Sequence, residues 1–146
     1  MGRKGLGEIM KKIGVGIDLI IKKDSKILLG KLSKKWRTPA GEWGFPGGDI
    51  NFGETLQKTI ERNLEKELGM KLKGFEIISV NANFWLGNHY INIGALVEAE
   101  GKEKLNNKED WEEWKWFDIK DLPEGICPPA KLTLGSFLKN KMSVSE

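Results

Sequence analysis

A glycine turn followed by a helical stretch carries the residues of this sequence that are best suited to chemistry. Gly48 is followed after five residues by Glu54 and after seven more by Arg62. Positions 63, 66 and 67 come next, and on a helix residues three and four apart project toward one neighbourhood. A hard divalent cation prefers carboxylate oxygens, so the residue types at these three positions decide whether the helix can bind one.

The three positions hold Asn63, Lys66 and Glu67, whose formal charges of 0, +1 and −1 sum to zero. An amide oxygen can coordinate a cation, but an ammonium group repels one. At an effective dielectric constant of about 20, unit charges about 4 Å apart interact by about 4 kcal/mol, enough for Lys66 to abolish a metal site. We therefore expect metal-dependent chemistry here to be badly weakened, while Lys66 could contact a phosphate directly.

The frame resembles the Nudix box, G-x5-E-x7-R-E-U-x-E-E-x-G-U, in which U is a bulky aliphatic residue. The matching residues are Gly48, Glu54, Arg62, Leu64, Glu67, Gly69 and Met70. Asn63 and Lys66 depart from the pattern, which has glutamates there. Residues 28–31, 43–48, 112–116 and 121–123 are also similar to stretches of small Nudix hydrolases of the MutT and nucleoside-triphosphate type.

The resemblance implies an α+β protein with the Nudix fold, a mixed β-sheet in an α/β/α sandwich. It also implies hydrolysis of nucleoside diphosphates linked to another group, with Mg2+ or Mn2+ offsetting the charge of the pyrophosphate. Glu67, Arg62 and Glu54 would be the catalytic residues, the last two as a supporting ion pair. The Gly48 carbonyl, the Asn63 amide and Glu67 would be the metal ligands of a site that is weak at most.

Three functions are consistent with these residues. The first is a protein that binds a nucleoside phosphate or a nucleoside-diphosphate-linked small molecule, with pyrophosphohydrolase activity weakened or lost because Asn63 and Lys66 replace glutamates. The second is an active Mg2+-dependent pyrophosphohydrolase whose metal site is rebuilt with Glu65, or with Glu109 and Glu112. The third is a protein-interaction module that binds no nucleotide.

Aromatic and basic residues supply candidate contacts to a nucleotide. Trp43, before the box, and Trp85, near a strand end, could stack on a nucleobase, with core or dimer packing as the alternative role. Lys31, Arg37 and Lys66 are candidates for phosphate contacts, and a solvated surface charge is the alternative for each. Glycines 47 and 48 would let the backbone approach the ligand closely.

Local patterns predict the elements that position these residues. Strands are expected at residues 13–22, 26–30, 43–45, 75–83, 90–98 and 114–117. A helix capped by Thr55 should run to about Leu68 and end at Gly69, because apolar residues recur every four positions along it. A second helix is expected at 131–141, a break in regular structure at 46–48, and an exposed loop at 102–110.

Length and composition predict a single domain, residues 13–142, preceded by an N-terminal segment, 1–12, that is expected to be flexible. One cysteine, Cys127, excludes an internal disulfide framework. The 24 basic and 21 acidic residues are interspersed, so no specific nucleic-acid partner is evident. No apolar run approaches the roughly 20 residues of a membrane span, and no secretory signal is visible. We expect a cytoplasmic protein with a nucleotide-type ligand, and a homodimer is plausible because Nudix proteins are often dimers.

Overall fold

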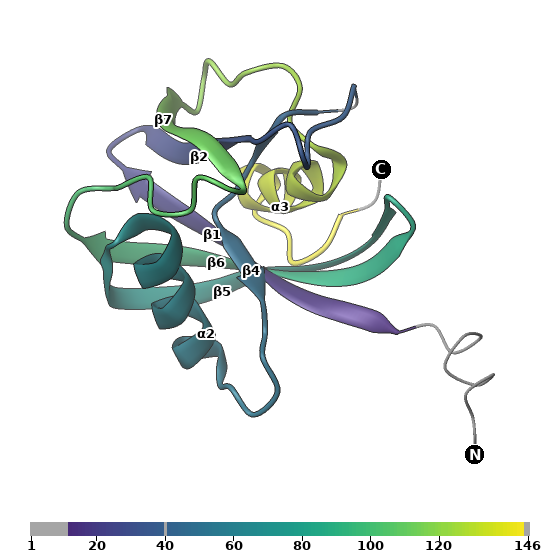
Figure 1. Cartoon of the computed structure of the whole chain (residues 1–146), viewed down its shortest axis with the longest axis horizontal. Helices are drawn as coiled ribbons and strands as arrows, with labels where there is room; N and C mark the ends of the chain where they lie inside the picture. Colours follow the sequence, from purple (N-terminus) through teal and green to yellow (C-terminus); the bar gives the residue numbers. More distant parts are fainter. Residues whose placement is uncertain (1–11, 40, 145–146) are drawn as a thin grey trace.

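The computed structural model describes residues 12–39 and 41–144, so the expected flexible segment lies, apart from Lys12, outside the described residues (Figure 1). The elements in chain order are β1 (Ile13–Lys23), β2 (Lys26–Leu32), β3 (Trp43–Gly44), β4 (Gly47–Asp49), α2 (Leu56–Asn63), the π-helical turn η1 (Leu64–Leu68), β5 (Lys71–Trp85), β6 (Asn88–Glu100), β7 (Trp111–Asp118) and α3 (Pro128–Lys139). The predicted strands and helices are present. The break expected at 46–48 is wrong in part, because Gly47–Asp49 forms β4.

The strands form a mixed seven-stranded sheet with the order β3-β2-β1-β6-β5, in which β4 pairs with β1 and β7 with β2. β1 runs parallel to β6, whereas β5 and β6 form a long antiparallel pair. β1 and β2 pair next to their turn, at Lys22↔Ile27 and Lys23↔Lys26. β2 then diverges from β1 and pairs with β7 along its length.

The two helices pack on different sides of the strands β1, β6 and β5 (Figure 1). On one side, Ile17, Leu19 and Ile21 of β1 pack with Ile60, Leu64 and Leu68 of α2 and η1. On the other side, Ile20 packs with Ala130 and Leu134 of α3. Neighbouring strand residues point to opposite faces, so the apolar residues on the two faces of β1 supply both cores. The result is the α/β/α sandwich and α+β class that the sequence predicts.

The helix of the box begins as predicted but ends differently. Thr55 Oγ1 accepts a hydrogen bond from the Lys58 backbone N–H at 3.2 Å, and Gly69 ends the helix at a φ of 66°. The predicted continuous α-helix is wrong beyond Asn63, because residues 64–68 form a wider π-helical turn. This turn leaves Lys66 exposed while Asn63 and Glu67 are buried, so the three side chains do not share one environment.

The C-terminal helix α3 starts three residues earlier than the predicted 131, at Pro128. Proline is suited to the first turn of a helix, where no intrahelical partner exists for its missing N–H. Asn140 closes the helix in the left-handed conformation, with a φ of 53°. The early start brings Cys127, Pro129 and Ala130 to the edge of the site described next.

Candidate functional site

A cleft of about 370 Å³ opens beside the N-terminal end of α3. Strands β1, β4, β5 and β6 contribute its polar lining residues, which are Asp18, Asp49, Asn83, Asn88, Tyr90 and Asn92. Its aromatic lining residues besides Tyr90 are Trp36, Phe45, Trp85 and Trp111. A concave surface with aromatic walls and a few polar groups is typical of a small-molecule site.

Gly47 and Gly48, which also line the cleft, are required by close approaches of the backbone. Gly47 has a φ of 148°, and a Cβ there would collide with the carbonyl oxygen of Ile17. A Cβ at Gly48 would lie 2.6 Å from the amide oxygen of Asn63. The two glycines therefore let β4 lie between β1 and the box helix, which we define as α2 together with η1.

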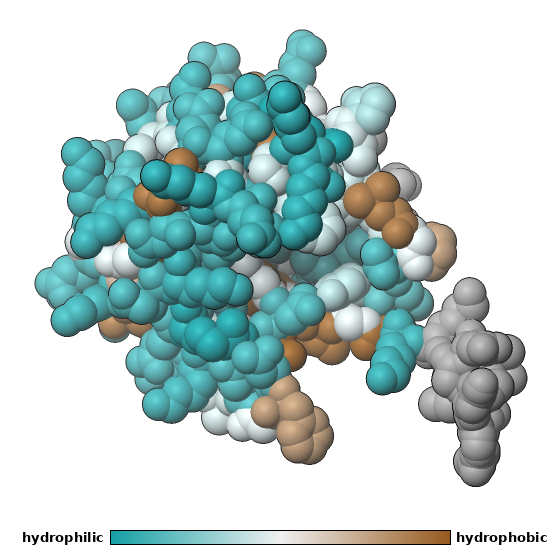
Figure 2. All heavy atoms as spheres, in the orientation of Figure 1, coloured by the Kyte–Doolittle hydropathy of each residue, from teal (hydrophilic) through white to brown (hydrophobic). Residues whose placement is uncertain are grey.

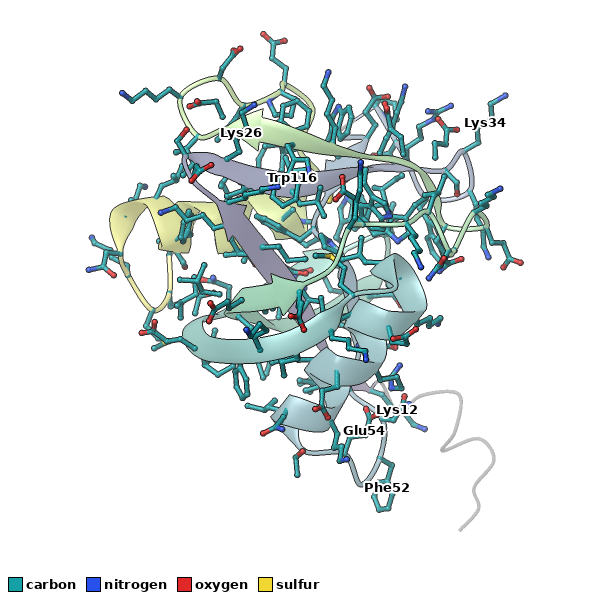
Figure 3. All side chains as sticks on the ribbon, turned by 90° about the vertical axis from the view of Figure 1, so that its left-hand side faces the viewer. Lys12, Lys26, Lys34, Phe52, Glu54 and Trp116 are labelled. Carbon is teal, nitrogen blue, oxygen red and sulfur yellow. The ribbon has the colours of Figure 1, made fainter. Side chains whose placement is uncertain are left out.

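Glu54 and Arg62 join the loop after β4 to the box helix. Arg62 Nε and Nη2 donate to the two oxygens of Glu54 at 2.6 and 2.9 Å, and Nη2 also donates to the carbonyl of Asp49 at 2.8 Å. The hydrogen bonds from Arg62 and from the Asn51 backbone lower the pKa of Glu54 to about 2. Figure 3 shows Glu54 at the base of the helix, near the loop tip from which Phe52 projects.

Glu67 is 4% exposed, and both of its carboxylate oxygens accept hydrogen bonds from a distant segment. Trp111 Nε1 donates to Oε1 at 2.7 Å, and Asn107 Nδ2 donates to Oε2 at 2.9 Å. Trp111 lines the cleft. The carboxylate thus connects the box helix to the segment that forms one wall of the cleft.

Asn107 extends this network to a second cleft-lining tryptophan. It also donates to Asp110 Oδ2 at 2.9 Å, while Trp36 Nε1 donates to Asp110 Oδ1 at 2.7 Å. Desolvation acts to raise the pKa of Asp110, but the hydrogen bonds from Trp36 and Asn107 act in the opposite direction and leave this pKa below its ordinary value. Glu67 and Asp110 therefore orient the indoles of Trp111 and Trp36.

The residues at the box do not fit a divalent cation held by Gly48, Asn63 and Glu67. The side chain of Asn63 is nearly fully buried, and its amide nitrogen donates to the carbonyl of Thr59 at 2.9 Å. The Glu67 carboxylate is buried, each of its oxygens accepts a hydrogen bond, and Lys66 adds a positive charge to the same turn. Within residues 12–39 and 41–144, no group of three His, Cys, Asp or Glu residues is placed to hold a metal ion. Glu67 is thus the single carboxylate of the set, it is buried, and it stands next to an ammonium group, so the set is a poor site for Mg2+.

The predicted aromatic contacts lie in different places. Trp85 lines the cleft. Trp43 does not line it, because its ring is buried in the core and packs edge-on against Phe117, with ring centroids 5.0 Å apart. In this structure Trp43 is a core residue.

The predicted basic contacts all lie outside the cleft lining. Arg37 Nη1 is 3.2 Å from Glu112 Oε1, so its charge is offset by an ion pair. Lys31 lies on β2, where it pairs with β3 and β7. Lys66 is exposed on η1, and within the described part of the chain it has no acidic partner within 4 Å.

Sequence reasoning missed the polar floor of the cleft, which includes Asp18, Asn83 and Asn92. Burial raises the pKa of Asp18 to about 6, against the opposing effect of hydrogen bonds from Thr133 and Asn92. One signal was available in the sequence. Asp18 is the single acidic residue of β1 and interrupts its apolar stretch at residues 13–21, and it lies two positions from Gly16, on the same face.

Residues 10–137 match the family model described as NUDIX domain. The chain belongs to the Nudix family. Together with the sandwich fold and the Gly48, Glu54 and Arg62 frame, this match identifies a MutT-like member of that family.

Relatives and solved structures agree with this assignment. An ADP-ribose pyrophosphatase from Methanocaldococcus jannaschii is 31% identical over 112 residues, which are 75% of this chain and 64% of that protein. An 8-oxo-dGTP diphosphatase from Buchnera aphidicola subsp. Schizaphis graminum is 30% identical over 113 residues, 77% of this chain and 82% of that protein. The crystal structure of a MutT Nudix hydrolase from Burkholderia pseudomallei superposes with a TM-score of 0.76 and 26% identity, covering 86% of this chain and 98% of that one.

Proposed function

We propose that this protein binds a nucleoside phosphate or a nucleoside-diphosphate-linked small molecule in the cleft. Its pyrophosphohydrolase activity with Mg2+ or Mn2+ is weak or lost. The two relatives described above are named for ADP-ribose and 8-oxo-dGTP, and both compounds contain a nucleoside joined to a chain of phosphates. The cleft supports a ligand of this kind because aromatic side chains can stack on a base and polar groups can fix its orientation.

One observation carries the proposed loss of activity, namely the hydrogen bonds that Trp111 and Asn107 donate to Glu67. Metal-assisted hydrolysis needs carboxylates that are free to coordinate the ion. Glu67 is the one carboxylate among positions 63, 66 and 67. It is only 4% exposed, and each of its oxygens is held by a hydrogen bond from one of these side chains. The carboxylate therefore has a structural role in shaping the cleft.

Lys66 is the proposed contact to the phosphates. Its side chain is exposed on η1, within the box helix, and carries a positive charge. A charge-assisted hydrogen bond of this kind contributes about 1.5 to 3 kcal/mol to binding. Arg37 is less available, because it already pairs with Glu112.

An active enzyme with a rebuilt metal site is the second candidate function. It is favoured by the intact Glu54–Arg62 pair and by the hydrolase names of the relatives. The rebuilt ligands suggested by the sequence, Glu109 and Glu112, form ion pairs with Lys35 and Arg37. These contacts favour the binding protein over the enzyme.

A protein-interaction module is less well supported. The face in Figure 2 is mainly hydrophilic, with hydrophobic residues in small separate groups.

No helix among the described residues is long and apolar enough to cross a membrane. A homodimer and a cytoplasmic location stay predictions from the sequence.

The test is isothermal titration of GDP, ADP, GTP and ADP-ribose into the protein in EDTA, with hydrolysis of the same compounds measured in Mg2+ and in Mn2+. Binding in EDTA without turnover supports the proposal, and Lys66→Ala should then weaken binding about 10- to 100-fold. Turnover that depends on metal supports the enzyme instead. The absence of binding under every condition supports the interaction module.

A further inference from the structure

A row of polar side chains crosses the floor of the cleft from β5 to β1. Asn83 Nδ2 donates to Asn92 Oδ1 at 3.0 Å, and Asn92 Nδ2 donates to Asp18 Oδ1 at 3.3 Å. From α3, the hydroxyl of Thr133 donates to Asp18 Oδ2 at 2.6 Å. These donors all lead toward Asp18, so its carboxylate is the acceptor at the end of the row.

Glycines place this carboxylate within reach of both α3 and the cleft. Gly94 pairs with Asp18 in the sheet, and a Cβ at Gly94 would collide with the hydroxyl of Ser79 and lie 3.0 Å from a methyl carbon of Thr133. The missing side chain therefore lets Thr133 approach Asp18. Gly16, on the same face of β1, lines the cleft beside it and adds no side chain above the row.

The row has unused hydrogen-bonding capacity. Each carboxylate oxygen of Asp18 accepts one hydrogen bond from the side chains described above, and a carboxylate oxygen can accept two. The amide nitrogen of Asn92 has two hydrogens, of which one is donated to Asp18. A ligand in the cleft therefore meets two acceptors beside one donor.

We propose that Asp18 and Asn92 read the Watson–Crick edge of guanine. The two oxygens of Asp18 accept hydrogen bonds from guanine N1–H and the N2 amino group, and the remaining N–H of Asn92 donates to O6. This assignment rests on the proposed nucleotide binding and specifies its base. Trp36, Trp85 and Trp111 also line the cleft, and a planar base can stack on such rings.

Other bases do not match this arrangement. Guanine has two neighbouring N–H donors followed by an acceptor on this edge. Adenine and cytosine place a ring acceptor next to their amino group, and uracil has one N–H between two carbonyls. Each of them would set an acceptor against the Asp18 carboxylate, and a buried polar group left without a partner disfavours binding.

The test uses tryptophan fluorescence to titrate GDP, IDP and ADP into the full chain in EDTA at pH 7.5. IDP lacks only the N2 amino group of GDP, so it isolates one of the two contacts to Asp18. We expect IDP to bind about 10- to 100-fold more weakly than GDP, and ADP to bind more weakly still. This comparison needs no variant and therefore does not depend on how a mutant folds.

A second arm compares Asp18→Asn with Asp121→Asn, the same change at an exposed position outside the cleft. Asp18→Asn should bring the affinity for GDP down to that for IDP, while Asp121→Asn should change neither. Equal affinities of the wild type for GDP and IDP would overturn the base assignment and leave nucleotide binding in place. An equal loss for all three ligands in Asp18→Asn would show a purely structural residue and also overturn it. If no ligand binds the wild type, the proposed function itself fails.

Discussion

Glu67 and Trp111 form a hydrogen bond of 2.7 Å between the box helix and the wall of the cleft. The Nudix pattern places a carboxylate at this position, and in this chain the carboxylate holds a cleft-lining indole. A second hydrogen bond, from Asn107, holds the other oxygen. The position has thus kept its residue type while its contacts are those of a structural residue.

The first prediction is that Glu67→Gln destabilises the protein. Glutamine keeps the shape of the side chain but replaces one acceptor oxygen by a donor, which then faces Trp111 or Asn107. We expect the free energy of unfolding to fall by about 1 to 3 kcal/mol. Urea unfolding at pH 7 measures it, with Glu65→Gln on the exposed side of the same turn as the control, expected within about 0.5 kcal/mol of the wild type. Equal stability of the two variants would contradict the structural role of Glu67.

The second prediction concerns the Glu54–Arg62 pair and acid. The hydrogen bond from Arg62 is the main cause that lowers the pKa of Glu54 from 4.5 to about 2 in the folded protein. The unfolded chain therefore binds the proton more tightly, so the pair stabilises the fold above pH 4.5 and loses this effect as the pH falls toward 2. The free energy of unfolding, measured in urea between pH 2 and 5, should depend less steeply on pH in Glu54→Gln than in the wild type. Glu61→Gln, on the same helix, is the control and should keep the pH dependence of the wild type. The same pH dependence in Glu54→Gln as in the wild type would refute the role of the Glu54–Arg62 pair.

The third prediction concerns Asp18, whose contribution to stability changes with pH in the opposite direction to that of Glu54. Burial raises the pKa of Asp18 from 3.8 to about 6, so the folded protein binds this proton more tightly than the unfolded chain. Asp18 therefore makes stability fall as the pH rises from about 4 to 6, by at most about 3 kcal/mol at 1.36 kcal/mol per pKa unit. Asp18→Asn should remove this loss, and unfolding measured from pH 4 to 8 tests it. The prediction fails if the stability of Asp18→Asn falls as much over this pH range as that of Asp121→Asn, the control variant.

The fourth prediction restores the box. Asn63→Glu with Lys66→Glu should raise or create Mg2+-dependent pyrophosphohydrolase activity, because Glu54, Arg62 and Gly48 keep their places in the frame. Without metal the new glutamate at position 63 would be buried beside Gly48, so the melting temperature should fall, and Mg2+ should restore it by mass action. A double variant with neither a Mg2+-dependent rise in melting temperature nor turnover would show that the site has diverged beyond its box.

The box helix could be predicted from the sequence because its signals act over a few residues. Thr55 caps it, Ile60 and Leu64 are buried as the four-residue spacing indicates, and Gly69 ends it. The π-helical turn could not be predicted in this way. Residues 64–68 have the same apolar spacing as an α-helix, yet they form a π-helical turn in which Lys66 is exposed and Glu67 is buried.

The cleft depends on contacts between residues far apart in the chain. Asp18 and Asn92 are 74 residues apart, and meet because β1 runs parallel to β6. Glu67 and Trp111 are 44 residues apart, and the predicted exposed loop at 102–110 gave no sign that it supplies Asn107 to the site. Strand alternation shows which residues share a face, but it does not show which strands are neighbours.

The central claim is that Glu67 orients Trp111 and does not support metal-dependent hydrolysis. The most direct test is the initial rate of GTP hydrolysis with saturating Mg2+ by the wild type and by Glu67→Gln, measured at a temperature where both are folded. We predict that the two rates are equal and no higher than the rate in buffer. A wild-type rate well above buffer that falls by a factor of about 100 or more in Glu67→Gln would contradict the claim and establish Glu67 as part of a working metal site.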